Sequence, residues 1–172
     1  MSFEIIDNGI QVGLFLLFAL FSLIQGLHMQ NRRFLILAGT YASFSMGTLY
    51  YLLYLVIMGK VPQVFYVSEM AWMASYLFLL ALCLMETRRY RGKLDVLVLG
   101  LTIVEAAMVI GWKILGPSYP FTVAFALVTA CIFYYALLGY RMEKRMLMLA
   151  MVLVIVWQLL LYIVSVFTTG YT

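Results

Sequence analysis

Charged residues are scarce in this sequence, and their scarcity excludes an ordinary soluble domain. Asp, Glu, Lys and Arg make up 10% of the 172 residues, whereas soluble domains contain about 25%. Hydrophobic residues reach 66%, and the mean hydropathy is +1.06. Because this composition leaves no room for a soluble domain beside membrane spans, we expect one all-α domain, residues 1–172, embedded in a lipid bilayer.

Histidine and cysteine are also rare, which limits the metals and cofactors that the chain can hold. The single histidine, His28, excludes a bis-histidine haem within one chain and a di-iron histidine cluster. The two cysteines, Cys83 and Cys131, both lie in apolar runs, and two sulfurs without a nearby histidine cannot make an ordinary zinc site. We therefore expect no metal, no cofactor and two reduced cysteines that serve in packing.

Motifs of catalysis are missing as well. The sequence contains no HExxH, no GxSxG, no paired-aspartate phosphotransfer motif and no CxxC. The loops between the apolar runs that carry most of the basic residues are too short to build a nucleotide site. These absences predict a protein that is not an enzyme.

What the sequence does contain is a series of six apolar runs, each about as long as the 20-residue helix that crosses a bilayer core. Short polar or Gly/Pro-containing turns separate them, such as the turn with Gly116, Pro117 and Pro120. The sequence therefore predicts a polytopic bundle of six transmembrane helices, with spans of residues 10–29, 34–58, 64–85, 94–115, 121–140 and 146–167.

The basic residues predict which ends of these helices face the cytoplasm. Of the 11 Lys and Arg residues, all but Lys60 and Lys113 lie in the first, third and fifth loops. The positive-inside rule then places these loops in the cytoplasm and both termini outside it. The same pattern explains the net charge of +4 without nucleic acid as a partner. The small size and short loops are typical of a multi-pass protein of the bacterial cytoplasmic membrane.

Two glutamates fall inside the predicted spans. Glu105 lies mid-way along the fourth helix and Glu69 near the outer end of the third. A charged carboxylate at the bilayer centre costs about 2.5–3.5 kcal/mol on insertion scales, so Glu105 should face the bundle interior or be protonated. Two interpretations stay open: each carboxyl is neutral and hydrogen-bonds a neighbouring helix, or it carries a proton or pairs with a cationic ligand.

Aromatic and polar side chains recur at helical spacing in the second, third and sixth predicted helices. If these stripes converge on the two glutamates, they form an outward-facing pocket for a small cationic or amphipathic ligand, through carboxylate pairing and cation–π contact. The predicted ligand-binding residues are Glu105, Glu69, Trp72, Tyr76, Tyr50, Tyr54, Gln158 and Tyr162.

Small residues offer a simpler explanation for part of this pattern. Gly39, Ser43 and Gly47 follow one another at a spacing of four, and Gly9 with Gly13 forms GxxxG. Both arrangements are typical of close helix packing in membranes. Since Ser43 and Gly47 also belong to the polar stripe, close helix packing alone would explain why small and polar residues recur along one face of the second helix.

One segment of the third helix, VSEMAWMASYLFLL (residues 67–80), resembles a helix in the multi-span input modules of some bacterial diguanylate cyclases and sensor kinases. In those modules an acidic residue precedes an aromatic residue and then a tyrosine, in a span that ends at basic residues. Glu69, Trp72 and Tyr76 carry the resemblance here. It implies ligand sensing with output through a partner, because this chain contains no GGDEF or kinase domain.

Two functions remain. The first is a sensory module that binds a small molecule from outside and signals through a cytoplasmic or membrane partner. The second is a small proton-linked secondary transporter, working as a homodimer, that uses Glu105 and Glu69. A carboxylate at the membrane centre favours transport, whereas the lack of a clear repeat and of Gly/Pro-broken spans favours the module. A non-catalytic structural subunit is a third hypothesis.

Overall fold

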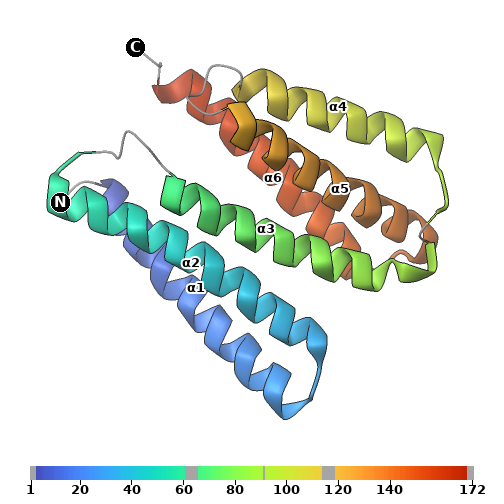
Figure 1. Cartoon of the computed structure of the whole chain (residues 1–172), viewed down its shortest axis with the longest axis horizontal. Coiled ribbons are helices and arrows are strands. Elements are labelled where there is room, and N and C mark those ends of the chain that lie inside the picture. Colours follow the sequence, from blue (N-terminus) through green and yellow to red (C-terminus); the bar gives the residue numbers. More distant parts are fainter. Residues whose placement is uncertain (1–2, 61–65, 91, 114–118, 170–172) are drawn as a thin grey trace. The chain divides into compact units, whose positions relative to one another are not determined.

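The computed structural model describes residues 3–60, 66–90, 92–113 and 119–169, and every regular element within these ranges is a helix (Figure 1). The all-α prediction is confirmed. These ranges contain six α-helices and one short 3₁₀ helix, η1. Their bounds are α1 (Phe3–His28), α2 (Arg32–Met58), α3 (Tyr66–Glu86), η1 (Arg88–Tyr90), α4 (Val96–Lys113), α5 (Tyr119–Glu143) and α6 (Met146–Thr169).

Four stretches are long and apolar enough to cross a membrane: Glu4–His28, Arg32–Met58, Val67–Glu86 and Phe121–Glu143. In α4 and α6 the apolar parts found among the described residues, Val96–Gly111 and Met146–Leu161, are shorter. These lengths and compositions are those of a membrane protein. Six crossings and extracytoplasmic termini stay predictions.

The helix bounds differ from the predicted spans mainly at the ends. Helix α1 begins at Phe3 rather than near residue 10, because its polar first turns are satisfied locally. The Asn8 side chain donates to the Glu4 carbonyl at 2.8 Å, and Gln11 donates to the Asp7 carboxylate at 2.8 Å. Helices thus continue past the apolar run wherever polar side chains bond within the same helix. Residues 64–65 and 114–115 of the predicted spans lie outside the described ranges.

The residue contacts divide the chain into two compact units, Met1–Leu82 and Cys83–Thr172. The first unit contains α1, α2 and most of α3. The second contains the last residues of α3, η1, α4, α5 and α6. The single six-helix domain stays a prediction.

In the first unit, α1 and α2 form an antiparallel pair (Figure 1). Asn31 caps α2 by accepting a hydrogen bond from the Arg33 amide at 3.0 Å. Gly59 ends the helix in the left-handed region, at φ 65°, where glycine is favoured. Along the pair, the Ser45 hydroxyl donates to the Val12 carbonyl at 3.2 Å, so a buried polar side chain joins the two helices.

Glycines bring α2 and α3 close together within this unit. A Cβ built at Gly47 would lie 2.7 Å from Cδ1 and Nε1 of Trp72, and one at Gly39 would lie 3.0 Å from the Phe78 ring. The packing role predicted for this small-residue series is confirmed at both glycines. The GxxxG pair has no such contact among the described residues, because Cβ atoms at Gly9 and Gly13 would meet no atom of another segment within 4 Å; its packing role stays a prediction.

In the second unit, α5 packs against both α4 and α6. Its core includes Val98 of α4, Ile132 and Leu138 of α5, and Met148 of α6, all almost fully buried. A Cβ at Gly139 would lie 2.9 Å from Thr87 and 3.1 Å from Met148, so this glycine permits a close approach at the loop end of the unit.

Candidate functional site

The most unusual side chain in the second unit is that of Glu105, on α4. Glu105 is 5% exposed, and neither of its carboxyl oxygens has a hydrogen-bond partner among the described residues. The neighbouring buried threonine of α4 differs, because the Thr102 hydroxyl donates to the Val98 carbonyl at 2.8 Å. Leaving a buried polar group unsatisfied costs about 1–3 kcal/mol, and more when the group is charged. Since this carboxyl does not stabilise the fold through a hydrogen bond to a described residue, Glu105 is a candidate functional residue.

Thr129 on α5 is the polar side chain that faces the Glu105 carboxyl. Its hydroxyl donates to the carbonyl of Ala126 at 3.2 Å. A hydroxyl has only one proton to donate, and that of Thr129 has two acceptors within reach, the Ala126 carbonyl and the Glu105 carboxyl. Thr129 can therefore serve at most one carboxyl oxygen, and an ionised Glu105 would need further donors from a molecule that enters the site.

In the first unit, Trp72 occupies the close contact between α3 and α2. Its indole lies against Gly47, and its ring centroid is 6.4 Å from that of Phe44. The indole nitrogen is buried and has no hydrogen-bond partner among the described residues. A buried tryptophan N–H usually finds an acceptor, so Trp72 is the second unsatisfied polar group among the predicted ligand-binding residues.

The remaining predicted residues of the first unit fall into two environments. Tyr50 and Tyr54, one turn apart on α2, have ring centroids 6.5 Å apart and are partly exposed. On α3, Tyr76 is buried and Glu69 is partly exposed. The structure therefore brings the two tyrosines of α2 together and places Trp72 against α2.

The predicted residues of α6 add little. Gln158 is partly exposed, and the side chain of Tyr162 lies outside the described residues. The outward-facing pocket combines residues of both units and stays a prediction.

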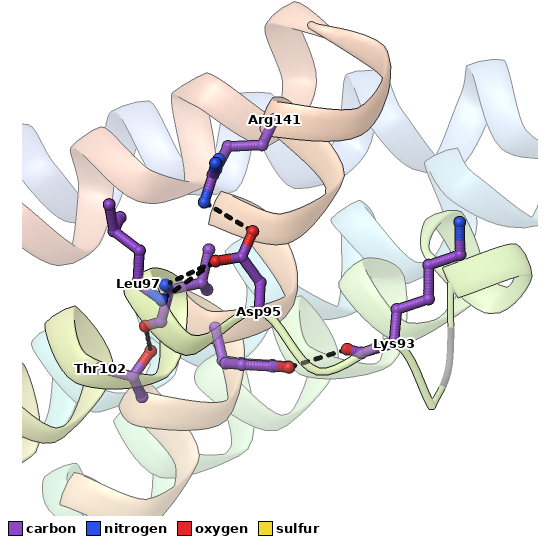
Figure 2. A network of polar contacts seen from close by, with 7 residues as sticks. Lys93, Asp95, Leu97, Thr102 and Arg141 are labelled. Carbon is purple, nitrogen blue, oxygen red and sulfur yellow. Dashed lines mark hydrogen bonds and ion pairs between the residues drawn. The ribbon is translucent and has the colours of Figure 1, made fainter.

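A polar network at the loop end of the second unit was not predicted (Figure 2). Asp95 Oδ1 accepts hydrogen bonds from the amides of Leu97 and Val98 at 3.1 and 3.2 Å. Its Oδ2 accepts from Arg141 Nη1 at 2.6 Å, which joins α4 to the last turn of α5. The Tyr134 hydroxyl donates to the Lys93 carbonyl at 2.9 Å and holds the same loop. An aspartate just before an apolar run is a sequence signal for a helix cap, but its pairing with Arg141 has no such signal.

A second set of contacts joins η1 to the turn between α5 and α6. Arg145 donates to Glu86 at 2.8 Å and pairs with Glu143. The Tyr90 hydroxyl donates to the Glu143 carboxylate, and this hydrogen bond raises the pKa of the tyrosine. The Glu86 side chain is only 4% exposed, so its pairing compensates a buried charge. The network fixes both loops at this end of the unit.

The two cysteines are free and differ in environment. Cys83 is fully buried, and its thiol donates to the Ile132 carbonyl at 3.8 Å. Cys131 is exposed, so the packing role predicted for it was wrong within this unit. Among the described residues, no group of three or more His, Cys, Asp or Glu is arranged to hold a metal ion.

Comparisons of the chain with protein-family models, with curated proteins and with solved structures find no match. A functional hypothesis therefore depends on the residues described above and on the chemistry they permit.

Proposed function

We propose that the chain is an integral membrane module that binds a small cationic or amphipathic molecule and signals through a partner protein. The observation that carries this proposal is the Glu105 carboxyl, buried in an apolar helix with no hydrogen-bond partner among the described residues. Ionisable residues at such positions usually mark a functional site. A ligand with an ammonium or amidinium group would supply the donors that the carboxylate lacks.

The competing structural interpretation treats Glu105 as a neutral group that joins two helices. That interpretation requires a hydrogen bond across helices, which is the usual use of polar side chains in membrane packing. Thr129 is the polar neighbour on α5, but its single hydroxyl proton is divided between the Ala126 carbonyl and the Glu105 carboxyl. Both carboxyl oxygens are buried without a hydrogen-bond partner among the described residues, which favours a ligand-binding group over a structural one.

In this proposal the aromatic residues contribute cation–π and apolar contact to the ligand. Trp72 has an unused indole donor, and the tyrosine pair of α2 presents partly exposed rings. Glu69 and Tyr76 belong to the same unit as these aromatic residues, whereas Gln158 and Tyr162 belong to the unit that contains Glu105.

The same carboxyl also supports a second candidate, proton-linked transport. A carboxyl without fixed donors exchanges its proton with an incoming cation, and this exchange is the elementary step of an antiporter. The polar network at the loop end of the second unit favours the sensory module, because it ties the start of α4 and η1 to the end of α5. Alternating access would need that arrangement to change.

The test replaces Glu105 with glutamine, which preserves shape and removes the ionisable group. The probe is benzamidinium, an amphipathic cation whose amidinium group donates N–H hydrogen bonds, and the measurement is its stabilisation of the detergent-solubilised protein against heat. We expect Glu105→Gln to fold like the parent and to bind the probe more weakly, by about 1–3 kcal/mol for a lost charge-assisted hydrogen bond. The control Asp7→Asn removes an exposed carboxylate and should leave binding unchanged.

Equal binding by the parent and by Glu105→Gln would contradict the proposal. Transport is tested in vesicles that contain a fluorescent pH indicator. If the probe drives proton movement in the parent but not in Glu105→Gln, the chain is a transporter.

A further inference from the structure

Four basic residues of the second unit lie close in sequence to Tyr90 or to Glu143, its hydrogen-bond partner. Arg88 and Arg89 belong to η1 together with Tyr90, and Lys93 places its ammonium 5.5 Å from the Tyr90 ring centroid. The fourth basic residue, Lys144, follows Glu143, whose carboxylate accepts the hydrogen bond from the Tyr90 hydroxyl. All four are exposed. We call this group, Arg88, Arg89, Lys93 and Lys144, the basic rim.

The carboxylates near the basic rim form ion pairs with arginines that do not belong to the rim. Asp95 pairs with Arg141, whereas Glu86 and Glu143 both pair with Arg145. None of the ion pairs found among the described residues includes a member of the rim. Arg89 also attracts the Glu143 carboxylate, but without a direct ion pair. Among the described residues, the rim therefore keeps charge that is available to an anion from outside the chain.

The backbone holds the basic rim in place. The Tyr90 amide donates to the Thr87 carbonyl at 2.9 Å, and the Thr87 hydroxyl donates to the Cys83 carbonyl at 2.7 Å, which fixes η1 to the end of α3. Lys144 has φ 51°, a left-handed conformation that glycine or asparagine usually adopts. Because these contacts order the backbone of the rim before an anion binds, less conformational entropy is lost on binding.

Exposed apolar side chains lie directly beside the rim in the sequence. Leu94 and Val96, next to Lys93, are each 83% exposed, and Met146 at the start of α6 is 78% exposed. Arg88 and Lys144 follow closely on the candidate spans Val67–Glu86 and Phe121–Glu143. Cations at the ends of apolar spans, flanked by exposed apolar side chains, match the boundary between phosphate headgroups and acyl chains. Nucleic acid or an acidic protein would leave these apolar side chains without a partner.

We propose that the basic rim binds the phosphate headgroups of anionic phospholipids. The guanidinium groups of Arg88 and Arg89 donate to phosphate oxygens, and the two lysines add charge. Leu94, Val96 and Met146 contact the acyl chains. This proposal does not depend on ligand binding at Glu105.

The test titrates the full chain in neutral detergent micelles with phosphatidylglycerol and follows its thermal unfolding. Parallel titrations use phosphatidylcholine and inorganic phosphate. We expect phosphatidylglycerol to raise the unfolding temperature and the other two to have no effect. Each cation near an anionic surface contributes about fivefold in affinity. Arg89→Gln should therefore raise the mole fraction of phosphatidylglycerol at half-effect about fivefold, and Lys60→Gln, an exposed lysine outside the rim, should leave it unchanged.

Lys144→Gly provides an independent variant, because glycine suits the left-handed backbone and preserves the fold while the charge is lost. It should show the same weakening as Arg89→Gln. Three outcomes would overturn the proposal: equal stabilisation by phosphatidylcholine, a full effect of inorganic phosphate alone, or parent-like titration of both variants. The first outcome would mean that the rim does not select anionic headgroups, and the second that it binds free anions. The third would mean that the rim is not a lipid site, as expected if it binds an acidic protein instead.

Discussion

At the scale of single residues, Gly47 shows how a missing side chain sets the distance between α2 and α3. Replacing it with leucine would place carbon atoms where Trp72 and the Ser68 carbonyl already lie, 2.7 and 3.0 Å from the new Cβ. Overpacking of this kind costs about 1–3 kcal/mol. We therefore expect Gly47→Leu to lower the thermal stability of the protein in detergent.

Gly13→Leu is the matched control for this prediction. It makes the same substitution in α1, where a Cβ would meet no described atom of another segment within 4 Å. Because leucine favours a helix over glycine by somewhat less than about 1 kcal/mol, Gly13→Leu should be neutral or slightly stabilising. If both variants unfold at the temperature of the parent, Gly47 does not sit at a tight contact.

Sequence reasoning finds some of these residues and misses others for physical reasons. Glu105 could be recognised because a carboxyl within an apolar run is rare and costly. The sequence does not show that the carboxyl oxygens lack hydrogen-bond partners, since this depends on which side chains of neighbouring helices reach Glu105. The two GxxxG-like patterns look alike in sequence, yet only that of α2 meets a neighbour, because the spacing of small residues does not say which face of a helix is covered.

At the scale of elements, Asp95 determines where α4 begins and what holds it. Asp95→Ala removes both the amide cap and the partner of Arg141. Losing a cap costs about 1 kcal/mol, and the exposed ion pair adds at most about 1 kcal/mol. Asp95→Asn keeps the cap and loses only the ion pair, so it should destabilise less.

Thermal unfolding of Asp95→Ala, Asp95→Asn and Arg141→Gln separates the two contributions. The last two remove the same ion pair from opposite sides and should unfold at similar temperatures. Equal stability of Asp95→Ala and Asp95→Asn would show that the cap contributes nothing. The predicted span began at residue 94 because hydropathy alone does not register a capping aspartate, whereas α4 begins at Val96.

At the scale of the whole molecule, the positive-inside pattern predicts which helix ends face outwards. The experiment introduces single cysteines into a Cys131→Ser background, so that the exposed native thiol cannot contribute to the signal, whereas Cys83 is buried. Cysteines at Asp7 and Lys60 should react with an impermeant thiol reagent added to intact cells, and one at Arg32 should not. Protection at Asp7 and Lys60 together with reaction at Arg32 would reverse the orientation.

The helical fold could be predicted almost completely, because each apolar run is long and its chemistry is uniform. The division into two units could not. It depends on which helices contact each other, and apolar helix surfaces that all suit lipid carry little information about their neighbours. The loop network of Asp95, Glu86 and Glu143 was missed for a related reason, since pairing between distant loops has no periodic signal.

The carboxyl buried in α4 also bears on how the protein is made. A helix with a carboxyl near its middle enters a bilayer less readily by itself than an uninterrupted apolar helix. Helix α4 packs against α5, where Thr129 faces the carboxyl, but α5 leaves the ribosome later. We expect the two helices to enter the membrane as a pair, so that synthesis of α5 sets the time at which α4 is committed to the bilayer.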